Sequence, residues 1–392
     1  MFPSNSVKWG KTRSCIRELM EYGVKRKKEI GDDKVFDYSL GNPSIEAPIE
    51  IKNTIIDLLN NEDSVKLHGY TTAAGNLSTR TVISNNLKKN YGVNVDPGKM
   101  YLTCGAAASL TITLHALVCE GDEIILNPPF FPEYSVFVCK SGAKEVRVTP
   151  NNDLSLNIND LNNKINNNTK AIIINSPNNP SGAIYSKDNL IELANLLRNK
   201  EEEYKHPIYL IVDEPYRELV YEDKYVSPLT LYEDSILCYS YSKSLSLPGE
   251  RIGYIALNNN LKDSDELYAA INGAGRSLGY VCAPSLWQKV IEKCDGLTSD
   301  INKYKENRDL LCSLLDEIGY KYIKPDGAFY IFVEALEKDA KAFSDKAKEF
   351  ELLLVPSDDF GVNGYVRLAY CIDKNTIINS KQAFKKLYDS YK

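Results

Sequence analysis

The sequence has few metal-binding side chains and no long apolar run. Only three of its 392 residues are histidine, which argues against a histidine-rich metal site, and we expect no bound metal. The nine cysteines are scattered and never spaced as Cys-x-x-Cys, so reduced thiols in a cytoplasm fit better than a disulfide framework. No apolar run approaches the roughly 20 residues that a membrane-spanning helix needs. The first residues lack the apolar core of a signal peptide, so we expect a cytoplasmic protein without membrane contacts.

Positive charge is also in deficit. The chain has 47 lysines and arginines against 53 aspartates and glutamates, a formal net charge of −6. An extended nucleic-acid surface needs clustered basic residues, so we expect no nucleic-acid partner. The basic run 25–28 follows an amphipathic stretch and is typical of the solvated face of a helix. Neither Gly-x-Gly-x-x-Gly after a first strand nor Gly-x-x-x-x-Gly-Lys-Ser/Thr is found, which argues against a nucleotide-binding α/β enzyme.

Short runs rich in β-branched residues recur through the middle of the chain. Their positions are 101–104, 123–126, 145–148, 171–174, 209–212, 236–239 and 252–255. Several are almost wholly apolar, as expected of strands buried on both faces. Helical patterns such as 106–118 and 187–198 separate many of them. Alternating strands and helices predict an α/β fold with a mainly parallel or mixed sheet.

The pattern changes from about residue 285. A helical stretch over 284–318, broken near 294–299, leads to the apolar run 328–333 and to further helices around 338–350 and after residue 373. This predicts a smaller α+β domain, against which a helix over 14–28 packs. At 392 residues the chain is long enough for two domains. We predict a large domain over 46–283 and a small one formed by 1–45 and 284–392.

The segment 240–253 carries the strongest chemical signal. Lys243 is framed by Ser240 and Ser242 directly after a predicted buried strand, and Arg251 follows in the same segment. In α/β proteins, ligands bind outside the carboxyl ends of the strands. Two hydroxyls and a guanidinium are able to hold a phosphate beside the lysine amine. A surface lysine in a polar turn is the competing interpretation.

Other polar or small residues also follow predicted strands. Asp213 and Tyr216 follow one strand and the turn 178–182 follows another, although turns and helix caps explain such residues equally well. Between a strand and a helix, the small residues 105–107 let backbone N–H groups approach a phosphate at the helix N-terminus. An aromatic pair, 130–131, stands between prolines, where a core position is the alternative.

Together these motifs resemble the fold-type I, pyridoxal-phosphate-dependent aminotransferases of class I/II, which are similar to aspartate aminotransferase. The family hallmark Ser-x-Ser-Lys-x-x-x-x-x-Gly-x-Arg-x-Gly is matched by Ser240, Ser242, Lys243, Gly249, Arg251 and Gly253. The resemblance runs from about residue 14 to the C-terminus, with the motifs in family order. It implies the family fold, in which helices sandwich a mainly parallel seven-stranded sheet beside a smaller α+β domain built from both ends of the chain.

The resemblance also implies the cofactor and its ligands. Pyridoxal 5′-phosphate would form a Schiff base with Lys243, and Asp213 would pair with its pyridinium nitrogen, so that the ring accepts electron density. The phosphate would be held by Gly105, Ala106, Ala107, Ser240, Ser242 and Arg251. Phe131 would stack on the ring, and Tyr216 and Asn179 would contact its phenolic oxygen.

Substrate residues and assembly follow from further matches. Gly41, in a Gly-x-Pro turn, and Asn179 are expected near the substrate carboxylate, which Arg367 would clamp with its planar guanidinium. Tyr70 would reach the phosphate of a neighbouring subunit, which implies a homodimer with shared active sites. Ala107 stands where some bacterial aspartate enzymes use a lysine for the distal carboxylate. The candidate replacements are Arg13, Arg17 and Arg276.

The implied reaction is ping-pong transamination between an L-amino acid and a 2-oxo acid, of aspartate or glutamate type or of broad specificity. The freed Lys243 amine would carry a proton between the substrate Cα and the cofactor C4′. A β-lyase, decarboxylase or synthase on the same fold is the alternative, because the motifs describe cofactor binding better than reaction type. A cofactor-bound regulatory domain is a weaker alternative, because the residues before position 14 are too few for a DNA-binding module.

Overall fold

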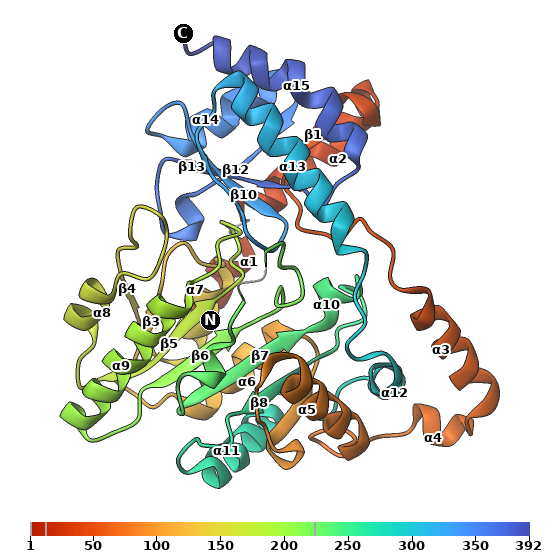
Figure 1. Cartoon of the computed structure of the whole chain (residues 1–392), viewed down its shortest axis with the longest axis vertical. Coiled ribbons are helices and arrows are strands. Elements are labelled where there is room, and N and C mark those ends of the chain that lie inside the picture. The colour runs from red at the N-terminus through yellow and green to blue at the C-terminus, as the bar shows by residue number, and fades with distance from the viewer. Residues whose placement is uncertain (1, 12–13, 223–224) are drawn as a thin grey trace.

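A seven-stranded sheet forms the centre of the lower part of the computed structural model, which describes residues 2–11, 14–222 and 225–392 (Figure 1). The strand order is β2 (Met100–Thr103), β8 (Gly253–Leu257), β7 (Ser235–Ser240), β6 (Tyr209–Asp213), β5 (Thr169–Asn175), β3 (Glu123–Leu126) and β4 (Lys144–Arg147). Strand β8 is antiparallel to both of its neighbours, β2 and β7, and the other neighbouring pairs of this sheet are parallel. The predicted mainly parallel, seven-stranded α/β fold is therefore confirmed.

Consecutive residues of the central strands belong to different cores. In β5, Ile172 and Ile174 pack into one hydrophobic cluster and Ile173 into another. The first cluster includes residues of α5 (Leu77–Tyr91) and α9 (Lys187–Tyr204), and the second includes residues of α6 (Ala106–Leu117), α7 (Glu133–Ser141) and α11 (Ser264–Ser277). Helices thus cover both faces, which explains why the strands read as continuous apolar runs.

A second, four-stranded antiparallel sheet lies above the first (Figure 1). Its order is β12 (Val355–Pro356), β13 (Tyr365–Ala369), β10 (Tyr330–Glu334) and β9 (Tyr322–Ile323). The helices of this region are α13 (Ile301–Ile318), α14 (Ala340–Ala347) and α15 (Lys374–Asp389). The first part of the chain joins them: β1 (Phe36–Asp37) pairs with β11 (Leu352–Leu353), and Leu19 of α2 (Cys15–Ile30) packs against Leu353.

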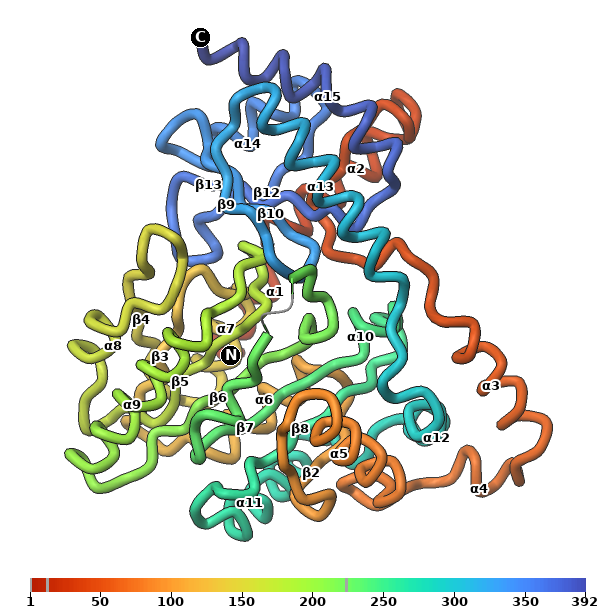
Figure 2. Tube along the Cα trace, in the orientation of Figure 1, coloured from red at the N-terminus to blue at the C-terminus, as the bar shows by residue number. Residues whose placement is uncertain are grey.

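Among the described residues, one connection between the upper and lower parts runs from β1 to α3 (Ile49–Asn61), and another runs from α12 (Ser285–Cys294) to α13 (Figure 2). The predicted helix break near 294–299 is confirmed, because α12 ends at Cys294 and α13 begins at Ile301. Val290 and Ile291 of α12 pack in the core of the large sheet, next to α3 and α5. The domain boundaries stay a prediction of the sequence.

The remaining helices are short: α1 (Ser4–Lys11), α4 (Ser64–His68), α8 (Ile158–Lys164) and α10 (Tyr241–Ser244). Within the described chain, no helix has the length and apolar character required to cross a bilayer.

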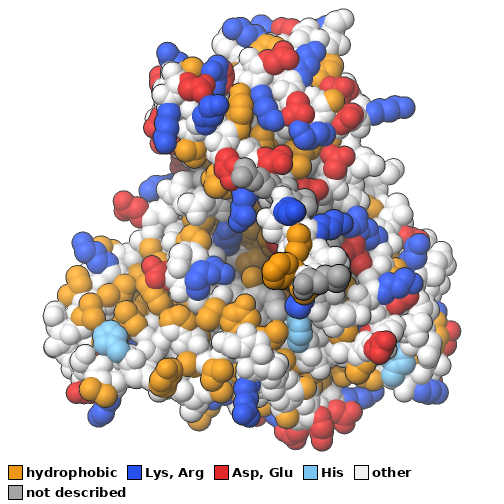
Figure 3. Space-filling view, turned by 180° about the vertical axis from the view of Figure 1, so that it is seen from behind, with side chains coloured by type: hydrophobic (Ala, Val, Ile, Leu, Met, Phe, Trp, Pro, Cys, Tyr) orange, Lys and Arg blue, Asp and Glu red, His pale blue; other side chains and the backbone are white. Residues whose placement is uncertain are grey.

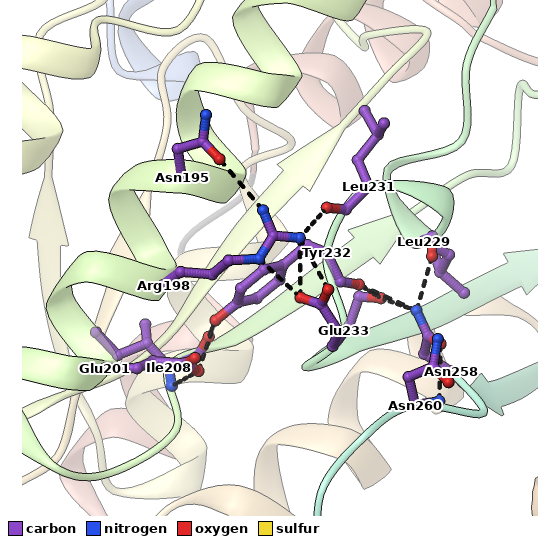
Figure 4. Close-up of polar contacts among 11 residues, drawn as sticks. Asn195, Arg198, Glu201, Ile208, Leu229, Leu231, Tyr232, Glu233, Asn258 and Asn260 are labelled. Carbon is purple, nitrogen blue, oxygen red and sulfur yellow. Dashed lines mark hydrogen bonds and ion pairs between the residues drawn. The ribbon is translucent and has the colours of Figure 1, made fainter.

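Polar contacts hold together the edge of the large sheet at which β6 and β7 begin (Figure 4). Arg198 of α9 donates from Nε to Glu233 Oε2 at 3.0 Å, and Tyr232 donates to Glu201 Oε1 at 2.6 Å. Asn258, just after β8, donates to the Leu229 carbonyl at 2.7 Å. These hydrogen bonds join the helix and the loops at this edge to one another. The opposite edge, where the parallel strands end, carries the predicted site.

Candidate functional site

A cavity of about 330 Å³ lies at the carboxyl ends of β5, β6 and β7. Parallel strands end at one edge of a sheet, so Asn175, Asp213 and Ser240, the last residues of these strands, all reach it. Of the predicted residues, Gly41, Ala106, Ala107, Phe131, Asn179, Asp213, Tyr216, Ser240, Ser242, Lys243, Arg251 and Arg367 line the cavity. Seen from behind, lysine and arginine side chains gather where the upper and lower parts meet (Figure 3).

Lys243 lies on α10, immediately after β7. Its side chain faces the cavity, and Nζ donates to the Gly41 carbonyl at 2.7 Å. Burial lowers the pKa of this amine from 10.5 to about 8, because the charged form loses hydration. The neutral amine that a Schiff-base nucleophile requires is therefore more abundant near neutral pH than it is for an ordinary lysine.

An anion cradle lies beside this lysine. The Ser240 and Ser242 hydroxyl oxygens are 2.7 Å apart, and Arg251 Nη1 donates to Ser242 Oγ at 3.4 Å. Helix α6 begins at Ala106, and the free backbone N–H groups of its first turn favour an anion. Gly105, which precedes it, has a φ of +84°, and a Cβ there would lie 2.6 Å from Arg251 Nη2. Gly105 therefore shapes the cradle without lining the cavity.

Asp213 ends β6 and is 5% exposed. Its Oδ2 accepts a hydrogen bond from Tyr134 at 2.5 Å, and Asn175 Nδ2 donates to its backbone carbonyl at 2.8 Å. Oδ1 is buried and has no partner among the described residues. Burial raises the pKa of this carboxyl to about 7. A cationic N–H in the cavity would complete the pair and restore the ionised form.

Arg367, on β13, is buried and lines the same cavity. Nη1 donates to Asn179 Oδ1 at 3.1 Å, Nη2 donates to the Ser39 carbonyl, and Nε has no partner in the described chain. The guanidinium lies 4.7 Å from the centre of the Tyr330 ring. Its described hydrogen-bond partners are all neutral, so a buried cation here lacks the carboxylate that it usually needs.

These features fit pyridoxal phosphate by their chemistry. The cradle offers hydroxyls, a guanidinium and a helix N-terminus for a phosphate, and the free Asp213 oxygen offers an acceptor for a protonated ring nitrogen. Lys243 and Arg367 line the same cavity. Phe131 supplies an aromatic side chain on the same wall.

Three candidate residues lie away from this cavity. Tyr70 is 99% exposed, and the exposed Arg276, in the last turn of α11, does not line the cavity of its own chain. Arg17 is exposed on α2, whereas its neighbour Ile16 lines the cavity. Arg13 lies outside the described residues.

The structure also adds residues that the sequence motifs did not identify: Ile16, Tyr134, Asn175, Pro215 and Tyr330 all line the cavity. Asn175 and Pro215 adjoin identified motifs, and their position at strand ends was the available signal. Tyr134 and Tyr330 reach the site through tertiary contacts to Asp213 and Tyr216, which no local pattern announces.

Comparison with known proteins gives consistent results. Residues 33–380 match the family model described as aminotransferase class I and II. The chain is 30% identical over 388 residues to a protein of Methanocaldococcus jannaschii named as a probable aspartate aminotransferase, covering 96% of this chain and 97% of the relative. It is 28% identical to aromatic-amino-acid aminotransferase 2 of Thermococcus litoralis, covering 87% and 88% of the two chains. Its fold matches the crystal structure of an amino transferase from Eubacterium rectale with a TM-score of 0.98 and 50% identity, covering 100% and 99%.

Proposed function

The chain belongs to the class I and II aminotransferases, and on that premise we propose that it binds pyridoxal 5′-phosphate through Lys243 and works by a ping-pong mechanism. As an aminotransferase, it moves an amino group between an amino acid and a 2-oxo acid. One observation carries the proposal: the Lys243 amine shares one cavity with an anion cradle, an unpaired buried carboxylate oxygen and a buried arginine without a carboxylate partner among the described residues. The cofactor supplies the electron sink that stabilises charge developing at the substrate Cα.

The residues that line the cavity have distinct tasks in this proposal. Ser240, Ser242 and Arg251, with the backbone at 105–107, hold the phosphate. Asp213 keeps the ring nitrogen protonated, and its own negative charge is stabilised in return. Phe131, which lines the cavity, would pack on the face of the ring.

Asn179 and Tyr216 would donate to the phenolic oxygen of the cofactor. Their positions support this role, because Asn179 contacts Arg367 and Tyr216 is buried on the cavity wall. The Lys243 amine would carry the proton of the substrate Cα. Its lowered pKa suits a base that works near neutral pH.

Arg367 recognises the substrate α-carboxylate, assisted by Asn179 and the Gly41 turn. Its planar fork binds a carboxylate in bidentate fashion, and its unpaired Nε is available for this purpose. For the side chain we propose an aspartate or glutamate type, or a broad specificity, since relatives carry both aspartate and aromatic names. Arg276 remains our candidate for a distal carboxylate. Because it lies outside the cavity of its own chain, it would have to act from a neighbouring subunit.

A homodimer in the cytoplasm with shared active sites completes the proposal. Exposed apolar side chains gather on α3, α4 and the segment that follows, at Ile49, Ile56, Leu59, Val65, Tyr70 and Leu77. Figure 3 shows orange side chains over this region, which lies on the left when seen from behind. Contiguous exposed apolar surface is typical of an interface. Tyr70, which is almost fully exposed, is then free to reach the phosphate of the other subunit.

Reductive trapping tests the central assignment. Protein purified with pyridoxal phosphate should be yellow, and borohydride should fix one pyridoxyl group per chain on Lys243. Lys243→Ala should abolish both the label and transamination, whereas Lys289→Ala, a surface lysine paired with Glu62, should retain both. Peptide mapping that placed the label on another lysine would overturn the assignment. Assays with acidic, neutral and aromatic amino donors would then define the specificity.

A further inference from the structure

Tyr330 contacts two residues of the cavity to which different tasks are assigned above. It begins β10, is 2% exposed and lines the cavity, yet it belongs to none of the motifs considered above. Its hydroxyl oxygen is 3.1 Å from that of Tyr216. Its ring centre is 4.7 Å from the Arg367 guanidinium carbon. One side chain therefore contacts both the residue assigned to the cofactor and the residue assigned to the substrate carboxylate.

Tyr330 also packs against the segment that holds Lys243. A Cβ at Gly41 would overlap the Tyr330 hydroxyl, so only glycine permits this close approach of the turn. The Gly41 carbonyl in turn accepts the hydrogen bond from Lys243 Nζ at 2.7 Å. Tyr330 is thus in contact with Tyr216, Arg367 and the backbone that orients the lysine.

We propose that Tyr330 is a positioning residue that links the Arg367 carboxylate clamp to the hydrogen bond between Tyr216 and the cofactor. The link rests on the proposed function. A Tyr216 hydroxyl that gives its proton to the phenolic oxygen must accept one from Tyr330, because each phenol has a single proton. Donation from Tyr330 polarises the Tyr216 O–H and strengthens its own donation.

This arrangement requires that both hydroxyls are protonated. Burial raises the pKa of Tyr330 to about 12 and that of Tyr216 well above its usual value, so both phenols keep their protons at neutral pH. The positive charge of Arg367 acts in the opposite sense on both. Neutralising that charge with a substrate carboxylate changes the field at both hydroxyls, and this is how binding at one end would be sensed at the other.

The test is an absorption titration of cofactor-loaded, substrate-free enzyme. Tyr330→Phe removes the hydroxyl but keeps the ring on Arg367. A weaker Tyr216 donor leaves the phenolic oxygen more basic, so the pKa of the Lys243-linked chromophore should rise by roughly half a unit. The kcat should fall a few-fold while KM for the amino acid stays nearly constant. Tyr330→Leu also removes the ring and should raise KM by about tenfold.

Two comparisons separate positioning from a general packing effect. Tyr38→Phe removes a buried hydroxyl of the same hydrophobic cluster that bonds Ser380 at 2.7 Å, and it should leave the titration unchanged. In a Tyr216→Phe background, Tyr330→Phe should produce no further shift, because its hydroxyl acts through Tyr216. Thermal unfolding of the cofactor-free variants checks that each is folded. If Tyr330→Leu does not fold, Tyr330→Phe alone decides.

The outcomes are distinct. A wild-type chromophore on Lys243 that titrates identically in Tyr330→Phe would overturn this inference and leave the proposed function intact. Equal effects of Tyr330→Phe and Tyr38→Phe, or fully additive shifts with Tyr216→Phe, would do the same. If wild-type protein forms no chromophore on Lys243, the proposed function fails and the inference fails with it.

Discussion

The Tyr134 hydroxyl donates to Asp213 Oδ2 at 2.5 Å and leaves Asp213 Oδ1 buried without a partner among the described residues. The two residues come from α7 and β6, on adjoining walls of the cavity. This bond fixes the rotation of the carboxylate. One oxygen is satisfied by the protein, and the other is left for a ligand, which is the arrangement that a pyridinium N–H requires.

From this relationship we predict a graded response to two substitutions. Asp213→Asn removes the charge opposite the ring nitrogen and should lower kcat/KM by roughly 10²–10³-fold, the usual effect of losing one preorganised electrostatic partner. Tyr134→Phe keeps the charge and loses only its orientation, so its loss should be smaller. Steady-state kinetics with saturating cofactor would measure both. A larger loss in Tyr134→Phe than in Asp213→Asn would contradict the proposed role of Asp213.

A second prediction concerns pH and the cofactor-free protein. The folded-state pKa of Lys243, about 8, lies below its unfolded value of 10.5, so the unfolded chain binds more protons between these values. Stability should therefore rise with pH from about 8 to 10.5. Lys243→Met removes this dependence and should raise the free energy of unfolding at pH 7 by on the order of 3 kcal/mol.

Denaturant unfolding of cofactor-free protein at pH 7 and pH 10.5 would check this. The difference between the wild type and Lys243→Met should shrink towards the higher pH, where the amine is neutral in the folded wild type and half neutral in its unfolded chain. Lys289→Met serves as a control at a partly exposed, ion-paired lysine. A difference between wild type and Lys243→Met that does not change with pH would show that packing, rather than the charge, causes it.

Much of the fold follows from local patterns in the sequence. The runs 171–174 and 209–212 are apolar at every position or nearly so, because helices cover both faces of the sheet, and this made the α/β arrangement predictable. Asp213 and Lys243 were assigned to one site by the family resemblance, and their positions at the ends of parallel strands agree with that assignment. The physical rule is that parallel strands end at one edge.

The partners of these residues were not predictable in the same way. Tyr134 lies 79 residues from Asp213, and Tyr330 lies 114 residues from Tyr216. Each tyrosine stands in an ordinary apolar segment, where a buried aromatic is the default expectation. Their roles depend on the contacts of their hydroxyls with Asp213 and Tyr216 in the folded chain. Local sequence patterns do not show such long-range contacts.

A third prediction concerns Arg367. Arg367→Lys keeps a positive charge but loses the planar fork, so it should retain cofactor binding while KM for amino acids rises strongly. Truncation in Arg367→Met should cost about 2–5 kcal/mol in kcat/KM, the range for removing one partner of a buried, hydrogen-bonded charge pair. Kinetics with an amino acid, and inhibition by a simple dicarboxylate, would measure the effect. Equal losses with the corresponding amine, which has no carboxylate, would refute a clamp.

The last prediction concerns shared active sites. Tyr70 is 99% exposed and belongs to the apolar surface around α3 and α4, so no described residue of its own chain covers its side chain. If each site borrows Tyr70 from its neighbour, Tyr70→Phe and Lys243→Ala subunits complement each other, because one of the two sites of a hybrid then has both residues intact. Refolded mixtures should exceed the activity of either parent. Hybrids isolated by two affinity tags should approach half the wild-type activity per dimer.

The control is a mixture of Lys243→Ala with Asp213→Asn subunits. Both of these residues line the cavity of the same chain, so a hybrid dimer contains no intact site. Lys243→Ala removes the lysine from one site and Asp213→Asn removes the carboxylate from the other, and each site then lacks one group. A gain with Tyr70→Phe but none with Asp213→Asn supports sharing. Absence of any gain with Tyr70→Phe, in hybrids shown to form, means that Tyr70 does not act across subunits and that its exposure needs another explanation.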